Sequence, residues 1–262
     1  MATGPESASV TAPERVVISV DAMGGDRGPA AVVAGLVDSI AQHPRLDVIL
    51  HGDQALLLPL LARHSDLTRR VALRHADRVV TMEDKPAQVM RHGAGTSMWS
   101  TIDAVRDGEA AAAVSCGNTG ALMAVSMLRL RKLPGLNRPA IASLFPTPTP
   151  GKLNVMLDMG ADVKADPQDL LQYAFMGASY ARNGLAISRP RVGLLNVGTE
   201  EHKGRAELQE ANALLSRSTE AGSFDYVGFI EGTDILSDRV DVIVTDGFTG
   251  NVALKAIEGT AR

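Results

Sequence analysis

Short apolar runs alternate with longer amphipathic stretches along this chain. The apolar runs predict buried strands at residues 16–20, 46–50, 71–73, 111–115, 141–145, 155–157, 192–197, 226–230 and 240–244. Helical periodicity predicts helices at 30–42, 53–64, 97–106, 120–132, 169–182 and 206–217. Because strands without polar alternation are usually covered on both faces, the pattern indicates an α/β protein with a mostly parallel sheet.

The pattern also suggests how the chain is divided. Its 262 residues suffice for one large α/β domain or two smaller ones. Residues 1–14, rich in Ala, Ser, Thr and Pro, predict a disordered tail, and 15–262 form the α/β region. Alternating prolines in 145–151 predict a surface turn or a connection between lobes. A helix predicted from 249 is followed by no closing strand, which indicates an edge element or a truncated chain.

Composition excludes several classes of protein. With 3% aromatic residues, the core must consist of Ala, Val, Leu, Ile and Met, and a net charge of -4 gives no reason to expect nucleic acid binding. No apolar stretch is long enough to span a bilayer, and one cysteine permits no internal disulfide, so we expect a cytoplasmic protein. We expect Cys116 to be a small buried side chain rather than a nucleophile, because no histidine is near it in sequence.

Candidate chemistry lies in loops that follow predicted strands, where open α/β sheets bind ligands. The first loop carries Asp21, Gly24 and Gly25, with Pro29 placed to open the next helix. The second, 115–120, leads into a helix whose free N–H groups form an anion site, and Asn118 is either a ligand-binding donor or an N-cap.

Two further loops have related compositions. Residues 196–204 include Lys203, which suits phosphate, beside carboxylates that alternatively form only local ion pairs. Residues 245–251 repeat the Gly, Thr and Asn chemistry of the second loop. The chain has no P-loop, dinucleotide fingerprint, nucleophile elbow or metal-ligand spacing, so we expect neither cofactor nor metal.

Segments 20–26, 115–121 and 246–252, together with 173–177 and 200–204, resemble the signature segments of the phosphate acyltransferase (PlsX) family. The resemblance implies a Rossmann-like three-layer α/β/α fold, related to isocitrate and isopropylmalate dehydrogenases and to phosphotransacetylase. It implies reversible transfer of a fatty acyl group from acyl carrier protein to inorganic phosphate, giving acyl phosphate for phosphatidic acid synthesis. It also implies a homodimer, peripheral membrane association, and a membrane-bound glycerol-3-phosphate acyltransferase as the next enzyme.

Three features depart from the family pattern. Family members usually continue through a further Gly-rich segment, so we expect this chain to lack their C-terminal part. Arg27 stands where His is common, and Asp162-Val163-Lys164 replaces a more usual Asn-Val-Asp.

From the loops and the resemblance we predict site residues. The catalytic set is Asn118, Lys203, Asp246 and Asn251. The substrate-binding set is Asp21, Gly24, Gly25, Gly117, Thr119, Gly120, Gly247, Thr249 and Gly250. Lys203 and the N–H groups of 118–120 hold phosphate, while Asn251 and the N–H groups of 247–250 polarise the carbonyl. Asp21, Asp246 and His202 all remain candidates to protonate the leaving thiolate.

Other expectations concern the substrate and rival functions. Methionines supply either acyl-groove walls or ordinary core: Met82, Met90, Met98, Met123, Met127, Met156 and Met176. A basic region with Arg129, Arg131, Lys132 and Arg138 is a candidate for docking acidic carrier protein. The alternatives are a metal-dependent dehydrogenase of the related fold and a non-catalytic scaffold at the membrane.

Overall fold

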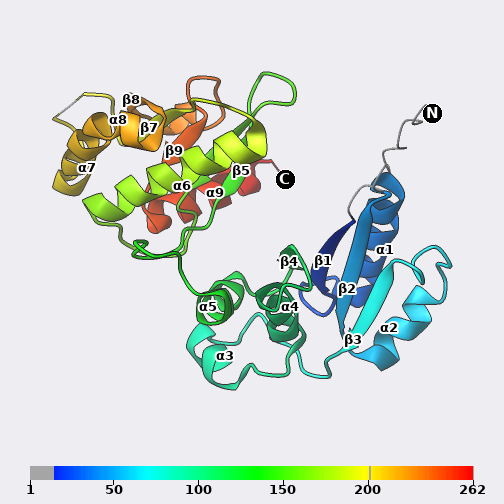
Figure 1. Cartoon of the computed structure of the whole chain (residues 1–262). Coiled ribbons are helices and arrows are strands. Elements are labelled where there is room, and N and C mark those ends of the chain that lie inside the picture. Colours follow the sequence, from blue (N-terminus) through cyan, green and yellow to red (C-terminus); the bar gives the residue numbers. More distant parts are fainter. Residues whose placement is uncertain (1–14, 201, 262) are drawn as a thin grey trace, which may run out of the picture. The chain divides into compact units, whose positions relative to one another are not determined.

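The computed structural model describes residues 15–200 and 202–261, so the predicted tail at 1–14 lies outside the described residues. The chain forms two compact units, Met1–Arg131 and Lys132–Arg262, and each is described by itself (Figure 1). The α/β region predicted from residue 15 onward therefore contains two smaller sheets.

The first unit is an open parallel sheet with helices on both faces. Its strands are β1 (Val16–Asp21), β2 (Leu46–Gly52), β3 (Val71–His75) and β4 (Ala112–Ser115), in the order β3-β2-β1-β4. All three strand pairs are parallel. The helices are α1 (Gly28–Gln42), α2 (Gln54–Leu61), α3 (Pro86–His92), α4 (Ser97–Arg106) and α5 (Thr119–Leu130).

Alternation along β1 shows how the two faces of this sheet are covered. Val20 belongs to a core cluster with Val33 and Leu36 of α1. Ser19 points to the other face, where its hydroxyl lies 2.7 Å from His51 Nε2. The second nitrogen of His51 lies 2.8 Å from Ser100 Oγ on α4. Successive side chains of a strand point to opposite faces, so the polar His51 cluster and the α1 core are separated by the sheet.

The second unit is a mixed sheet of five strands. These are β5 (Ser143–Pro146), β6 (Leu153–Leu157), β7 (Arg191–Leu195), β8 (Asp225–Ile230) and β9 (Val242–Val244), in the order β5-β6-β9-β7-β8. Only the β5–β6 pair is antiparallel among these pairs. The helices are α6 (Pro167–Leu185), α7 (Ala206–Arg217), α8 (Thr219–Gly222), the 3-10 turn η1 (Gly232–Asp234) and α9 (Gly247–Thr260).

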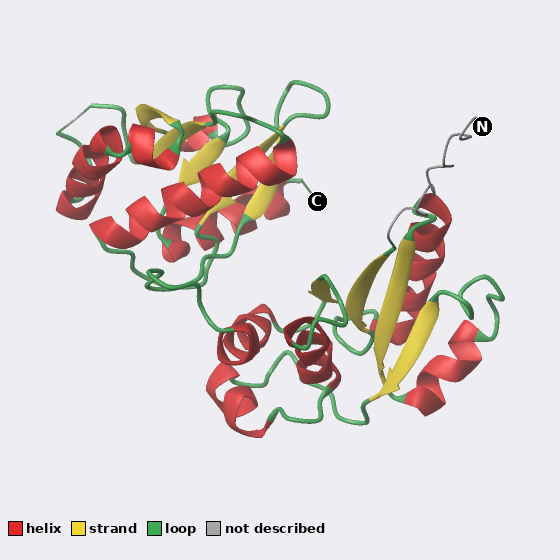
Figure 2. Ribbon diagram, in the orientation of Figure 1, coloured by secondary structure: helices red, strands yellow, loops and turns green. Residues whose placement is uncertain are grey.

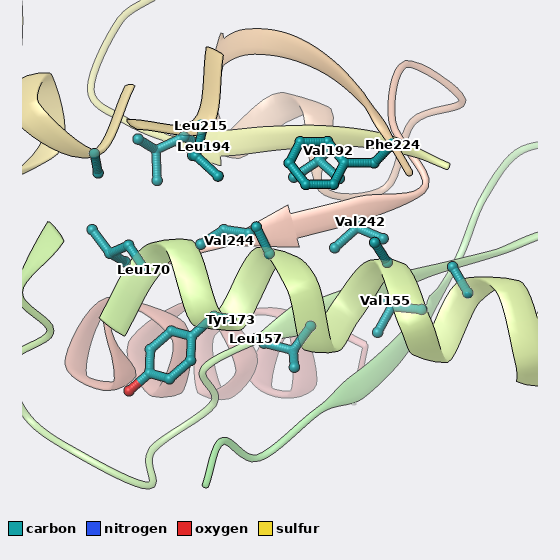
Figure 3. Packing of buried hydrophobic residues seen from close by; sticks show 14 of the residues in the cluster. Val155, Leu157, Leu170, Tyr173, Val192, Leu194, Leu215, Phe224, Val242 and Val244 are labelled. Atoms are coloured by element: carbon teal, nitrogen blue, oxygen red, sulfur yellow. The ribbon is translucent and has the colours of Figure 1, made fainter. Parts of the chain in front are cut away.

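Burial follows the same alternation in the second unit. Val242 and Val244 belong to a buried cluster with Leu170 and Tyr173 of α6, drawn in Figure 3. Ile243 between them belongs to another cluster, against which Leu254 of α9 packs. Each unit therefore has three layers, with a mostly parallel sheet between helices, as predicted (Figure 2).

Every predicted strand and helix is present, most of them with shifted ends, whereas α4 and α7 have the predicted bounds. The proline-rich segment forms the turn of the β5–β6 hairpin, which confirms the surface turn. The boundary between the units instead follows Arg131. Helices α3 and α8 were not predicted, because seven and four residues are too short to show a helical period.

Candidate functional site

In the first unit the predicted first and second loops meet at the carboxyl ends of β1 and β4. Asp21 pairs in register with Ser115, and the Ser115 hydroxyl donates a hydrogen bond to Asp21 Oδ2 at 2.8 Å. The Met23 N–H donates to Asp21 Oδ1 at 3.1 Å. Asp21 is buried, and both of its oxygens accept hydrogen bonds that fix the two loops. The structure therefore shows Asp21 as a support of the loops.

Close approach between these loops explains the glycines. A Cβ placed on Gly24 would lie 2.7 Å from the Gly117 nitrogen, so only glycine fits without a shift of the backbone. Gly25 has φ +93°, a conformation that favours glycine, and packs against Cys116. Cys116 itself is exposed, so its predicted burial is wrong. Cys116 follows exposed Val114 on β4, an edge strand, and both residues line an open cavity beside α1.

The start of α5 is built by Asn118. Its Oδ1 accepts a hydrogen bond from the Ala121 N–H at 3.0 Å, which confirms the N-cap interpretation. Its Nδ2 lies 2.9 Å from the Asp84 carbonyl oxygen and also contacts the carbonyl oxygens of Thr81 and Met82. Both the oxygen and the nitrogen of the Asn118 side-chain amide therefore have hydrogen-bond partners within the first unit.

This cap leaves two donors available. The N–H groups of Thr119 and Gly120 have no hydrogen-bond partner within residues 15–200 and 202–261. The first N–H groups of a helix point along its axis, and the helix macrodipole adds a partial positive charge there. The α5 start is therefore suited to an anion at the carboxyl edge of the first sheet.

In the second unit, Asp246 has the corresponding place at the start of α9. Its carboxylate accepts hydrogen bonds from the Thr249 N–H at 2.9 Å and the Thr249 hydroxyl at 3.0 Å. Arg205 forms an ion pair with it. The predicted loop 247–250 is thus the first turn of α9, and most of its N–H groups are occupied. Gly247 donates to Asp162 at 3.4 Å and Gly250 to the Asp246 carbonyl at 2.9 Å.

Two groups at the α9 start remain available to a ligand. In the described chain, the Phe248 N–H and the side-chain amide of Asn251 have no recorded hydrogen-bond partner. Asn251 is exposed, beside Gly160 of the loop that follows β6. The structure thus narrows the predicted carbonyl-binding groups to one backbone donor and one side chain.

A buried carboxylate that the sequence analysis missed supports this helix start. Asp158 follows β6 and accepts hydrogen bonds from the Ile141 and Ala161 N–H groups at 2.9 and 3.0 Å. Its other oxygen accepts from the Asp162 N–H at 3.0 Å. A Cβ on Gly250 would lie 1.9 Å from the Asp158 carbonyl oxygen. The loop after β6 therefore packs directly beneath the first turn of α9.

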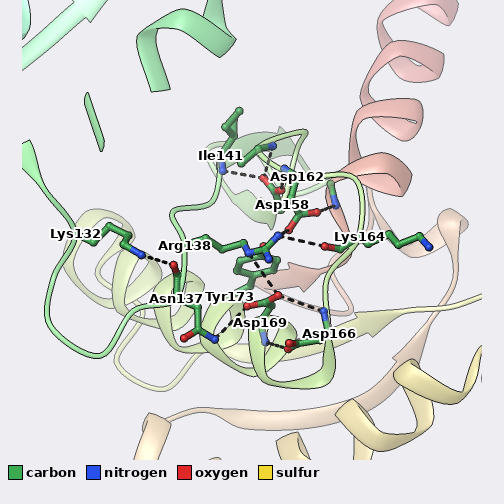
Figure 4. A network of polar contacts seen from close by, with 12 residues as sticks. Lys132, Asn137, Arg138, Ile141, Asp158, Asp162, Lys164, Asp166, Asp169 and Tyr173 are labelled. Carbon is green, nitrogen blue, oxygen red and sulfur yellow. Dashed lines mark hydrogen bonds and ion pairs between the residues drawn. The ribbon is translucent and has the colours of Figure 1, made fainter. Parts of the chain in front are cut away.

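Figure 4 shows how Asp162 extends this support. Its carboxylate accepts a hydrogen bond from the Tyr173 hydroxyl at 2.5 Å and lies 3.2 Å from an Arg138 nitrogen. Arg138 also pairs with Asp169 at 3.5 Å. Burial, followed by the hydrogen bond to Asp162, raises the pKa of Tyr173 above its ordinary range. The only signal in the sequence was the departure at residues 162–164 from the family pattern.

The Lys203 loop lies in the same unit. Lys203 Nζ is 2.7 Å from Glu200, so the predicted local ion pair is present, and that hydrogen bond raises the pKa of the lysine. The Lys203 carbonyl accepts a hydrogen bond from Asn196 at 3.0 Å. Lys203 and His202 are both exposed, whereas Glu201 lies outside the described residues.

The remaining predicted features are dispersed. Arg129 pairs with Asp103 at 2.6 Å and lies over the Trp99 ring, and Arg138 belongs to the Asp162 network, so half of the proposed basic region already has acidic partners. Met98 and Met156 are fully buried core residues.

Within the part of the chain that the structure describes, no group of three potential metal ligands occurs. No described helix combines the length and apolar character needed to cross a bilayer.

Two larger cavities accompany the helix starts. One of about 580 Å³ lies beside α1 and β4 in the first unit, and its lining includes Asp21, Gly24, Gly25 and Cys116. The other, about 530 Å³, lies beside α7 and α9 in the second unit, and its lining includes Asp246 and Thr249. None of the predicted groove methionines lines either cavity.

Comparison with known proteins shows the family of this chain. Residues 16–262 match the family model described as "Fatty acid synthesis protein". Phosphate acyltransferase of Cereibacter sphaeroides is 68% identical over 260 residues, covering 97% of this chain and 71% of that protein. Phosphate acyltransferase of Paracoccus denitrificans is 68% identical over 247 residues, covering 94% of this chain and 67% of that protein.

A solved phosphotransacetylase from Streptococcus pyogenes shares the fold, with TM-score 0.67 at 15% identity, over 94% of this chain and 82% of that one. At this identity the likeness concerns the fold alone. The family match and the identity to the phosphate acyltransferases identify the protein at the level of family. The chain belongs to the fatty acid synthesis protein family of acyltransferases.

Proposed function

We propose that this chain transfers a fatty acyl group from a carrier-protein thioester to inorganic phosphate. The observation that carries the proposal is the start of α5, where the Thr119 and Gly120 N–H groups have no partner among the described residues and the cap is a neutral amide. These groups suit a phosphate dianion, and the names of the relatives support the same chemistry.

The reaction needs positioning and charge stabilisation rather than a covalent intermediate. A phosphate oxygen attacks the thioester carbonyl, the C–O bond forms, and the C–S bond breaks as the thiolate leaves and takes up a proton. We assign polarisation of the carbonyl to the Asn251 amide and the Phe248 N–H, because both are available at the α9 start. We assign to Lys203 the neutralisation of the phosphate charge. Its ammonium group must then leave Glu200 and bind the phosphate instead.

The proton for the thiolate is assigned to His202. The oxygens of Asp21 are occupied by Ser115 and Met23, and those of Asp246 by Thr249 and Arg205. His202 is exposed, and an imidazolium side chain can donate a proton to a leaving group. A His202→Gln variant should therefore lower kcat while leaving the KM for phosphate near its original value.

The finer biological assignments rest on the resemblance. We propose acyl carrier protein as the donor, a homodimer as the active species, and peripheral association with the membrane. The acyl phosphate would pass to a membrane-bound glycerol-3-phosphate acyltransferase for phosphatidic acid synthesis.

The decisive experiment measures release of carrier-protein thiol from acyl carrier protein with and without phosphate, trapping acyl phosphate with hydroxylamine. We expect phosphate-dependent release, and a loss of about 100-fold or more in kcat/KM for both Lys203→Ala and Asn251→Ala, as is usual for charge-stabilising groups. Lys255→Ala is the matched control, since Lys255 is exposed on α9 and pairs only with Glu258 in the described chain. Thiol release that is independent of phosphate would overturn the proposal.

A further inference from the structure

The cavity of the second unit has the size and lining of a ligand site. Its volume of about 530 Å³ lies within the range of small-molecule pockets. Its walls come from the end of β7, from α7, from the first two turns of α9 and from the η1 region. The apolar lining residues are Leu195, Val197, Leu208, Ile235, Phe248, Val252 and Ala253.

Three of these apolar side chains are unusually exposed. Val197 is 81% exposed, Phe248 62% and Val252 54%, although all three line the same cavity. Scattered exposed apolar residues need no explanation, but a group of them around one concave site indicates a surface that binds an apolar ligand.

The polar end of the cavity coincides with the start of α9. Asp246, Thr249 and Arg205 line it there. Phe248 lies in the lining too, and its N–H at the helix start has no partner among the described residues. An acyl chain extends from its carbonyl carbon, so the group that binds the carbonyl must lie at one end of the chain's groove. The cavity and the proposed carbonyl-binding groups meet this requirement within one unit.

We propose that this cavity binds the alkyl chain of the acyl substrate, with its carbonyl end at Phe248 and Asn251. The inference rests on the proposed function, which supplies the acyl group. The cavity of the first unit is also apolar, but it lies beside the loop that supports the α5 start. Phosphate, which we assign to the α5 start, has no alkyl chain that could fill the cavity of the first unit.

The test measures binding, so it requires no turnover. Calorimetry would compare β-ketophosphonates carrying an undecyl or a methyl group, which are stable analogues of acyl phosphates. Each methylene held in the cavity improves affinity by up to about fourfold. The undecyl compound should therefore bind at least about 100-fold more tightly than the methyl compound.

Val252→Trp places a bulky side chain on the α9 wall, and Phe248→Ala removes the ring one turn earlier on the same wall. We expect each to reduce the undecyl-to-methyl affinity ratio by about tenfold or more. Ala256→Trp is the matched control, because it lies one turn further along α9 and outside the lining. Gly35→Leu fills the other cavity, where an added Cβ meets nothing within 4 Å.

The outcomes separate this inference from the proposed function. A ratio lost in Val252→Trp and Phe248→Ala but retained in both controls supports the chain site, even if thiol release proves independent of phosphate. A ratio unchanged in both cavity variants overturns the chain site, even if the enzyme is fully active. Loss of the ratio in Gly35→Leu instead would also overturn it and assign the chain to the first unit.

Discussion

The two units each begin a helix at the carboxyl edge of a sheet, but they cap it differently. In the first unit the neutral amide of Asn118 caps α5, and the Thr119 and Gly120 N–H groups are left without partners in the described chain. In the second unit the carboxylate of Asp246 caps α9, and the N–H groups of Gly247, Thr249 and Gly250 are occupied.

This difference separates two helix starts that look alike in sequence. Within the described residues, a dianion near α5 meets donors without partners and a neutral cap, whereas near α9 it would meet few donors and a buried carboxylate that Arg205 already pairs with. A neutral carbonyl oxygen needs only one or two donors, and a nearby carboxylate repels it less strongly than it repels a dianion. We infer that the identity of the cap, rather than the glycines around it, decides which ligand each helix start can bind.

The largest expected effect tests how tightly the α9 start is packed. The methyl group added by Gly250→Ala would lie 1.9 Å from the Asp158 carbonyl oxygen. Either the helix or the loop after β6 must therefore move. We expect a loss of about 3 kcal/mol in the free energy of unfolding, at the upper end of overpacking costs. Urea denaturation with amide exchange of β9 measures it.

Gly120→Ala is the matched change in α5. Its new methyl group would lie 3.1 Å from Pro86 Cγ, a contact that needs a shift of a few tenths of an ångström, and alanine favours the helix. The change in stability should stay within about 1 kcal/mol. Equal costs for the two variants would contradict the claim that the α9 start is the more tightly enclosed.

The elements of both sheets were predictable because burial imposes a simple pattern on them. Strands such as β7 are apolar runs covered on both faces, and α4 and α7 begin and end as their periodicity predicts. The positions of the loops after β1, β4, β7 and β9 could be predicted from the strand pattern, and their ligand-binding role stays a prediction that rests on the general behaviour of α/β sheets.

The hydrogen-bond partners within those loops could not be predicted. Asn118 was equally consistent with a cap and a ligand donor, and only its contact with the Asp84 carbonyl shows that its amide is occupied. Asp158 has no motif of its own, since its role depends on residues that lie far from it in the chain. Exposure of Cys116 depends on which strand lies at the sheet edge, and a sequence pattern does not specify strand order.

The next effect concerns acid stability, where the first unit should be the weaker. Burial lowers the pKa of His51 from 6.5 to about 4, assisted by Arg74. The unfolded chain therefore binds a proton below pH 6.5 that the folded unit resists. Stability from this group is complete above pH 6.5, declines on acidification, and falls by about 3 kcal/mol in total once the pH reaches about 4.

Amide exchange of β2 and β9 across this pH window measures the two units separately. His51→Gln removes the titrating group while keeping a side chain able to bond to Ser19 or Ser100. That variant should be less stable than the original near neutrality but should lose the pH dependence assigned to His51. An unchanged slope for β2 in His51→Gln would show that other groups cause the acid sensitivity.

The smallest expected effect exchanges the caps themselves. Asn118→Asp keeps an oxygen to cap α5 but brings a negative charge to the proposed phosphate site and removes the donor to the Asp84 carbonyl. We expect the KM for phosphate to rise about tenfold, equivalent to ~1.4 kcal/mol. Asp246→Asn makes the opposite change at α9 and should leave the KM for phosphate within about twofold while lowering kcat, because the α9 start is assigned to the carbonyl. Steady-state kinetics with varied phosphate distinguishes the two, and a larger rise in phosphate KM for Asp246→Asn would reverse the assignment of the two helix starts.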